Sequence, residues 1–123
     1  IQEWNRFVDE ILAEKNFPQK EAAKIRIAVD EIFSNICYYS KAQSLTIGCL
    51  VNEEAAMLYF EDDGIPYNPL NRPDPDTSES AENRKEGGLG IYLVKKRMDS
   101  LRYEYAEGKN RLTIMKNRNA RKD

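Results

Sequence analysis

Apolar side chains recur at helical spacing in the first third of the chain. Residues 2–16 carry five of them, with charged residues between: Trp4, Phe7, Val8, Ile11 and Leu12. A broader apolar face of the same period follows over residues 19–39: Ile25, Ala28, Val29, Ile32, Phe33 and Ile36. Spacing of this kind buries one side of a helix against a core. The pattern therefore predicts two amphipathic helices separated by Phe17-Pro18, and the second is the longest expected in the chain.

Shorter apolar runs bounded by turn residues predict two antiparallel hairpins. The expected strands cover residues 45–51, 56–62, 101–107 and 111–116. The first pair turns at Asn52-Glu53-Glu54 and the second at Gly108-Lys109-Asn110. A third helix is expected between the hairpins, because apolar residues return to helical spacing after a cluster of glycines: Leu89, Leu93, Val94 and Met98.

The predicted order is helix, helix, strand, strand, loop, helix, strand, strand. Helices with one apolar face and antiparallel strands pack most simply as two layers, with all helices on one side of the sheet. We therefore expect one α+β domain over residues 1–116, with a long polar loop at 63–87. Loops of that length inside a compact domain are often lids over a site. Residues 117–123 have nothing to bury and are expected to form a flexible basic tail.

The composition excludes several classes of function. The 123 residues carry 19 basic and 21 acidic side chains, so a net charge of -2 gives no general attraction to nucleic acids or membranes. No apolar run approaches membrane-spanning length, and we expect a cytoplasmic protein. Histidine is absent, which excludes histidine triads, histidine metal sites and phosphohistidine relays. Cys37 and Cys49 have apolar neighbours and no metal-ligand spacing, so we expect buried free thiols in a reducing cytoplasm.

A carboxylate and an amide lie four residues apart in the second predicted helix. Glu31 and Asn35 therefore point the same way from adjacent turns, next to apolar positions. The amide oxygen could hold Mg²⁺, which prefers oxygen ligands, while the carboxylate activates a hydroxyl or a water. A local pair on the helix surface is the alternative interpretation.

The second predicted strand ends in Asp62-Asp63-Gly64-Ile65-Pro66-Tyr67. These residue types are common in an ordinary turn after a strand, which is one interpretation. The other is a nucleobase site. A carboxylate fixed at a strand end can accept a hydrogen bond from an exocyclic amine, and a glycine beside it lets a flat base approach the backbone.

The third predicted helix begins within Glu86-Gly87-Gly88-Leu89-Gly90. The first N–H groups of a helix have no intrahelical partner and lie at the positive end of its dipole, which suits phosphate oxygens. A tight turn without a ligand is the alternative. Because this turn does not follow a strand within a strand–helix–strand unit, a Rossmann dinucleotide site is excluded.

The three motifs, in this order, resemble the N, G1 and G2 boxes of the GHKL ATPase superfamily: Glu31-x-x-x-Asn35, Asp62-x-Gly64-x-Pro66 and, after a polar lid, Gly88-x-Gly90. Within that superfamily the short chain is similar to the bacterial anti-sigma factor serine/threonine kinases. The resemblance runs from about Gln19 to Met115. It implies the Bergerat ATP-binding fold, a two-layer α/β sandwich with helices on one face of a mainly antiparallel mixed sheet.

The resemblance also implies roles for the first two boxes. Glu31 matches the family's general base, and Asn35 matches the asparagine that ligates Mg²⁺. Asp62 matches the aspartate that binds the amino group of adenine. Gly64 is expected to open room for the base, and Pro66 lies in the same nucleotide-binding box.

The third box is implied to wrap the ATP phosphates. Gly88 and Gly90 match the family's glycines, with Leu89 between them, and Lys85 at the end of the lid is a further candidate phosphate contact. A lysine in a polar loop can equally be solvated and without a role.

Three further residues depart from the family's pattern or leave its use open. Family members often carry histidine four residues after the N-box asparagine, whereas this chain has Tyr39 there, which we expect to substitute by packing or hydrogen bonding. Tyr67 and Asn68 suit a loop near the adenine pocket, although an aromatic residue there can equally pack within the lid.

The function implied by the resemblance is an anti-sigma regulatory factor that uses ATP and Mg²⁺. It would bind a sigma factor and phosphorylate a serine or threonine of a STAS-type antagonist protein, and family members are commonly homodimers. The alternative is a module that binds partners under nucleotide control and transfers no phosphate. The catalytic domain of a sensor histidine kinase fits less well, since the chain has no phosphoacceptor histidine.

Overall fold

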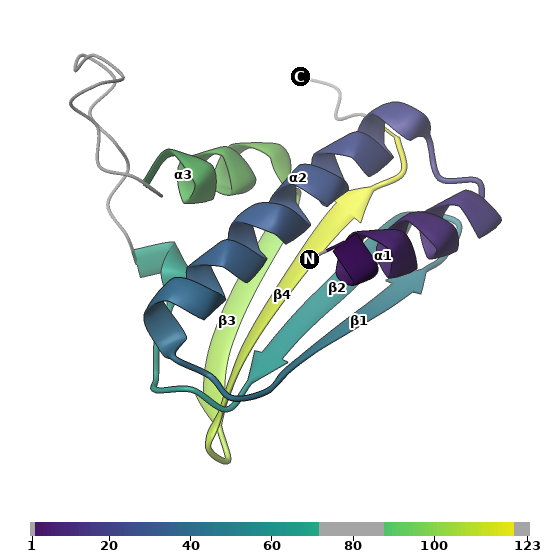
Figure 1. Ribbon diagram of the computed structural model, residues 1–123. Coiled ribbons are helices and arrows are strands. Elements are labelled where there is room, and N and C mark those ends of the chain that lie inside the picture. Colours follow the sequence, from purple (N-terminus) through teal and green to yellow (C-terminus); the bar gives the residue numbers. More distant parts are fainter. Residues whose placement is uncertain (1, 72–87, 120–123) are drawn as a thin grey trace, which may run out of the picture.

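The computed structural model describes residues 2–71 and 88–119 and places the helices on one face of a sheet (Figure 1). The elements in chain order are α1 Gln2–Glu14, α2 Gln19–Asn35, β1 Leu45–Val51, β2 Ala55–Asp62, α3 Gly88–Arg97, β3 Ser100–Ala106 and β4 Lys109–Asn117. This order and the two layers confirm the predicted α+β class. Within the described ranges, no helix has both the length and the apolar composition that crossing a membrane requires.

The four strands lie in the order β1-β2-β4-β3. Each neighbouring pair is antiparallel, so the described part of the sheet lacks the parallel strand that the expected mixed sheet would contain. The two hairpins meet where β2 pairs with β4. This long-range pairing places the end of β2 beside the start of β4, with Asp62 opposite Asn110.

Burial alternates along the two central strands, as the period of a strand that is covered on one face requires. The helices cover the inner face and form one core with it: Val8, Leu12, Ile25, Ala28, Val29, Ile32, Ile47, Ala56, Leu58, Phe60, Val94, Met98, Leu112 and Ile114. On β2 the alternation ends at Asp62, and on β4 it begins at Asn110 and ends at Lys116. All three polar side chains are buried, so the inner face is apolar in its middle and polar at both ends.

The second helix continues past α2 as a turn of π-helix, Ile36–Ser40, which ends where Lys41 adopts a φ of 57°. Ile36 and Ser40 are buried, whereas Cys37 lies on the exposed side of the turn. The expectation of a buried Cys37 was therefore wrong. It was inferred from apolar neighbours in the sequence, but one of these neighbours, Tyr38, is itself 76% exposed. Cys49 is half-buried, and burial raises the pKa of its thiol to about 11.

The first hairpin turns where predicted, and the second does not. The side-chain Oδ1 of Asn52 accepts the N–H groups of Glu54 and Ala55, both at 2.8 Å, which closes the first turn. The second turn is Glu107-Gly108, where φ is 54° and 76°. Both values are typical of a two-residue hairpin turn. The predicted turn over residues 108–110 was wrong: the observed turn starts one residue earlier and ends two residues earlier, so Asn110 belongs to β4.

The first residues of the expected tail belong to the fold. Asn117 is the last residue of β4, and the guanidinium of Arg118 lies 5.0 Å from the ring centroid of Phe17. The guanidinium also donates to four main-chain oxygens, those of Lys15, Asn16, Asn52 and Glu53. Arg118 thus joins the end of α1 to the first hairpin turn. Residues 120–123 of the expected tail lie outside the described residues.

A buried ion-pair cluster closes the end of β4 that is remote from Asn110. Lys116 Nζ lies 2.9 Å from Glu21 Oε2 and 2.8 Å from Asp99 Oδ2, and all three side chains are at most 5% exposed. Burial alone would raise the pKa of Glu21, but the hydrogen bond and charge of Lys116, helped by Lys24, hold that pKa below its usual value. The cluster joins the first turn of α2, the segment after α3 and β4.

We expect Lys116→Ala to lower the free energy of unfolding by about 3 kcal/mol at neutral pH, because it removes the buried cation shared by Glu21 and Asp99 and leaves Glu21 only the more distant Lys24. The loss should shrink as the pH falls below the usual carboxyl range, where Glu21 takes up a proton. Urea denaturation at several pH values measures both effects. Lys109→Ala, at an exposed position of the same strand, is the control and should change stability little. A loss below 1 kcal/mol for Lys116→Ala contradicts the expectation.

Candidate functional site

Asp62 is held by one of its two carboxylate oxygens. Oδ1 accepts the backbone N–H of Gly64 at 2.9 Å and Nδ2 of Asn110 at 3.0 Å. Within the described residues, no donor contacts Oδ2, although the residue is only 3% exposed. The geometry therefore leaves Oδ2 available for a hydrogen-bond donor from outside the protein.

Asn110 is the residue that organises this end of the sheet. Besides Asp62, its Nδ2 donates to the carbonyl of Ile65 at 2.8 Å and more weakly to that of Gly64 at 3.4 Å. Its Oδ1 accepts the N–H of Tyr67 at 3.0 Å and the hydroxyl of Tyr103. The side chain is 3% exposed and uses all of its hydrogen-bonding capacity.

Sequence reasoning missed Asn110, because the residue was assigned to a turn. The alternation of β4 was a usable signal. Every second residue is buried, and counting backwards from Lys116 these are Ile114 and Leu112. One further step of two residues reaches Asn110. Extending the alternation by that step would have placed its side chain on the inner face, opposite the end of β2.

The two aspartates at the end of β2 have different tasks. Asp63 is exposed, and its Oδ1 accepts the N–H groups of Gln43 at 2.9 Å and Ser44 at 3.0 Å. These backbone hydrogen bonds hold the pKa of Asp63 below its usual value. Asp63 thus ties the loop after β2 to the segment before β1, while Asp62 faces the interior.

Gly64 allows a close contact between this loop and the end of the π-helical turn. A Cβ atom at Gly64 would lie 2.2 Å from the carbonyl oxygen of Ser40, and the N–H of Ile65 donates to that same oxygen at 2.9 Å. This reason for the glycine is internal to the protein and was not foreseen, since room for a base was the expected one. Pro66, the last residue of the box, is exposed.

Glu31 and Asn35 do not pair through their side chains. Asn35 is 3% exposed, and its Nδ2 donates to the main-chain oxygen of Glu31 at 3.1 Å. Its Oδ1 accepts the hydroxyl of Tyr67 at 3.1 Å. The carboxylate of Glu31 makes no hydrogen bond within the described residues and is therefore available for other chemistry.

The start of α3 lies against Glu31. A Cβ atom at Gly90 would lie 1.9 Å from Oε2 and 2.6 Å from Cδ of that carboxylate, so the glycine lets the first turn of α3 approach α2. The helix begins at Gly88, as the glycine cluster predicted. The fold therefore brings the N box and the G2 box into contact. Lys85 and residues 72–87 of the expected lid lie outside the described residues.

Two tyrosines fill the space between the first two boxes. The ring of Tyr67 stacks on that of Tyr39, with centroids 5.1 Å apart and planes at 21°. Tyr39 therefore packs against another side chain, which is one of the two roles expected for it. Tyr67 contacts the N box through its hydroxyl, which donates to Asn35, and its N–H donates to Asn110, which in turn donates to Asp62 of the G1 box.

The donor set suits a metal ion that arrives with a nucleotide. Among the described residues, no three His, Cys, Asp or Glu side chains are grouped to hold a metal by themselves. Mg²⁺ commonly takes one or two protein oxygens and completes its shell with phosphates and waters. The carboxamide oxygen of Asn35 can supply one such ligand.

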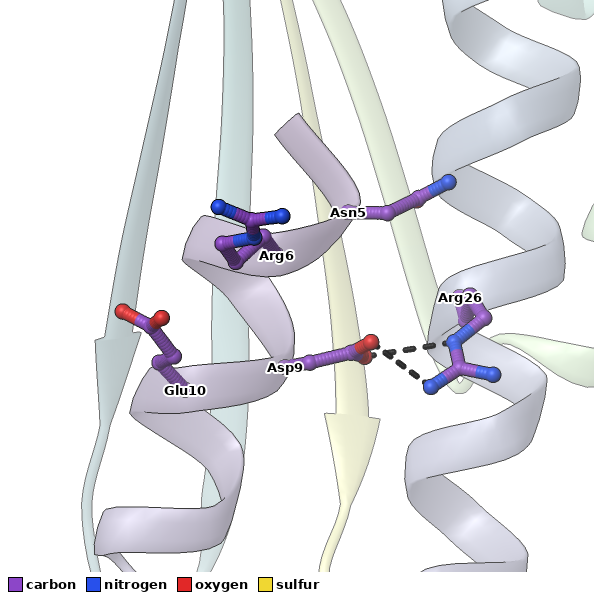
Figure 2. A pocket seen from close by; sticks show the side chains of 5 residues that line it. All are labelled: Asn5, Arg6, Asp9, Glu10 and Arg26. Carbon is purple, nitrogen blue, oxygen red and sulfur yellow. Dashed lines mark hydrogen bonds and ion pairs between the residues drawn. The ribbon is translucent and has the colours of Figure 1, made fainter. Parts of the chain in front are cut away.

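A hollow between α1 and α2 is lined by a different set of residues (Figure 2). It is lined by Asn5, Arg6, Asp9, Glu10 and Arg26. Arg26 Nη2 lies 2.6 Å from Asp9 Oδ2, which raises the pKa of the guanidinium and ties α1 to α2 at the surface. The hollow contains none of the residues of the three boxes.

Comparisons with known proteins identify the family to which the chain belongs. A family model of the histidine kinase-like ATPase domain matches residues 1–116. The chain therefore belongs to the family of histidine kinase-like ATPase domains, as the three boxes predicted. One similar protein is the serine-protein kinase RsbW of Listeria monocytogenes serovar 1/2a, which is 26% identical over 106 residues, or 80% of this chain and 68% of that protein.

A solved structure with the same fold is the histidine kinase AdeS of Acinetobacter baumannii. The match has a TM-score of 0.58 at 20% identity and covers 80% of this chain. The chain spans about half, 48%, of that kinase chain. The likeness therefore shows a common fold for the ATPase domain.

We expect Asn110→Asp to destabilise the fold by about 3 kcal/mol at neutral pH, since it places a second carboxylate against Asp62 in a buried pocket. Part of that loss should return towards pH 5, where the two carboxyl groups can share a proton. Denaturation of both proteins at each pH gives the difference. Asn119→Asp, an exposed change of the same kind, is the control. Equal losses at both pH values would contradict the pairing.

Proposed function

We propose that this domain binds ATP with Mg²⁺ and acts in the cytoplasm as an anti-sigma regulatory kinase. It would hold a sigma factor and phosphorylate a serine or threonine of a STAS-type antagonist protein. Family membership supports the nucleotide, and the similarity to a protein named a serine-protein kinase supports the reaction. The observation that carries the proposal is the contact of Glu31 with Gly90, which sets a candidate base beside a candidate phosphate site.

The adenine end of the proposed site is Asp62. Its uncommitted Oδ2 would accept a hydrogen bond from the exocyclic amine of adenine, while Asn110 and Gly64 hold Oδ1. A carboxylate is an acceptor only, so it favours an amine over the carbonyl oxygen that guanine carries at the same place. Gly64 and Pro66 belong to the loop that would lie along the base.

The phosphate end of the proposed site is the start of α3. Backbone N–H groups of Gly88, Leu89 and Gly90 would bind phosphate oxygens there, with Lys85 as a further contact. Asn35 would ligate Mg²⁺ through Oδ1, and the ion would offset the charge of the phosphates. Transfer of a phosphoryl group depends mainly on such positioning and charge neutralisation.

Glu31 would act as the general base in the transfer step. Its carboxylate takes the proton of the acceptor hydroxyl while that oxygen bonds to the γ-phosphorus. The bond from the γ-phosphorus to the bridging oxygen breaks, and ADP leaves with the electron pair. The absence of any competing hydrogen bond within the described residues suits the carboxylate to this role.

We expect the protein to bind Mg-ATP, and Asp62→Asn to weaken binding by about ten- to a hundredfold, because a charge-assisted hydrogen bond to the adenine amine is lost. Calorimetric titration with ATP and with ADP measures both affinities. Asp63→Asn, the neighbouring exposed aspartate, is the matched control and should bind as the wild type does. A folded wild type that binds neither nucleotide would refute the proposed function.

Glu31→Gln should keep nucleotide affinity and lose phosphoryl transfer by about a hundredfold or more, since general-base catalysis typically contributes that much. Transfer of ³²P from ATP to each STAS-type antagonist of the same genome is the readout. Glu54→Gln, in the exposed first hairpin turn, is the control. Undiminished transfer by Glu31→Gln would exclude this base. Binding of nucleotide and partners without transfer by the wild type would favour the nucleotide-controlled binding module.

A further inference from the structure

Tyr67 connects the two ends of the site through direct contacts. Its main-chain N–H donates to Asn110 Oδ1 at 3.0 Å, and its hydroxyl donates to Asn35 Oδ1 at 3.1 Å. Asn110 in turn donates to Asp62 at 3.0 Å. Tyr67 therefore links the carboxylate at the end of β2 to the amide oxygen on α2, through hydrogen bonds at its main chain and at its hydroxyl that are joined by its own side chain.

The two contacts of the Asn35 carboxamide fix which way its oxygen points. Nδ2 donates to the main-chain oxygen of Glu31, so a reversed amide would set Oδ1 against that carbonyl. The hydroxyl of Tyr67 holds the oxygen from the other side. A carbonyl oxygen has two lone pairs, and this hydroxyl uses one of them. Within the described residues no second donor contacts this oxygen, which leaves the other lone pair for a cation.

The ring of Tyr67 is itself held in place by the element that carries Asn35. It stacks on Tyr39, which lies four residues after Asn35 in the π-helical turn. Tyr38 packs edge-on against Tyr39, with ring centroids 4.7 Å apart. The phenol is therefore supported on its face and at its hydroxyl, and its position relative to Asn35 is defined.

We propose that Tyr67 is a positioning residue that orients the Asn35 oxygen for Mg²⁺ and links the metal end of the site to its adenine end. The inference rests on the proposed function of the site. Without the hydroxyl, the carboxamide keeps only its contact with Glu31 and turns more freely, so the metal gains less from it. A nucleotide that carries no metal does not use the Asn35 oxygen and should not sense the change.

The test compares ATP affinity in Mg²⁺ with ATP affinity in EDTA, and the ratio of the two measures the contribution of the metal. In Tyr67→Phe we expect this ratio to fall about fivefold, the effect of one hydrogen bond, while the affinity in EDTA stays near that of the wild type. Asn35→Ala should remove the same contribution. Adding Tyr67→Phe to Asn35→Ala should then change the ratio no further, because residues acting through one contact are not additive.

Tyr38→Phe is the matched control. It removes the same atom from the same aromatic cluster, at a side chain that is 76% exposed, and should leave the ratio unchanged. Thermal unfolding of each variant separates positioning from general support. A Tyr67→Phe variant with a lower melting temperature and equal losses of affinity in Mg²⁺ and EDTA would show a purely structural role and overturn the inference.

Two other results would also overturn it. An unchanged ratio in Tyr67→Phe means that the hydroxyl does not act on the metal ligand. A raised ratio means that the hydroxyl competes with the metal for the Asn35 oxygen. Either result leaves ATP binding itself intact and so leaves the proposed function standing. Failure of the wild type to bind ATP in both media is the different outcome that would refute the proposed function.

Discussion

The pairing of Asp62 with Asn110 is the constraint on which the rest of the site depends. Both side chains are 3% exposed, and they meet because β2 and β4 pair in one antiparallel register. A buried polar group costs free energy unless it is hydrogen-bonded, so each of them requires the other. Asn110 then fixes the loop after β2 through the main chain of Ile65 and Tyr67. A shift of the register by one residue would turn the whole set to the open face of the sheet.

Polar side chains are buried at both ends of the inner face of the sheet, and their charges are compensated in different ways at the two ends. At one end, Lys116 contacts two carboxylates, those of Glu21 and Asp99, and opposite charges offset each other. At the other end, within the described residues, one oxygen of Asp62 and the carboxylate of Glu31 lack donors. The first arrangement neutralises its charges within the protein, whereas the second leaves acceptor oxygens open to water or to a ligand. This contrast separates a candidate site from a structural cluster of similar composition.

Periodicity predicted the helices, the strands and their order, because the spacing of apolar residues records which side of each element is buried. It failed where contacts between distant segments decide. Asn110 resembles a turn residue locally, and only its pairing with β2 makes it a strand residue. Cys37 has apolar neighbours in sequence, but the π-helical turn exposes it. Arg118 is kept in place by carbonyl groups more than sixty residues away, such as those of Asn52 and Glu53. None of these partners can be found from local spacing.

Two glycines of the boxes, Gly64 and Gly90, have a structural role besides the one expected toward a ligand. A ligand-centred interpretation assigns Gly64 to the base and Gly90 to the phosphates. In the structure a Cβ atom at either position would collide with a group of another segment, the carbonyl of Ser40 or the carboxylate of Glu31. The collision with Ser40 involves backbone and cannot be relieved by a side-chain rotation, whereas Glu31 can turn aside. A side chain at Gly64 would therefore disturb the fold, and one at Gly90 would disturb the position of the proposed base. The boxes lie far apart in the chain, yet Gly64 and Gly90 each make room for a residue of another segment. For this reason the boxes together indicate the fold better than any one of them alone.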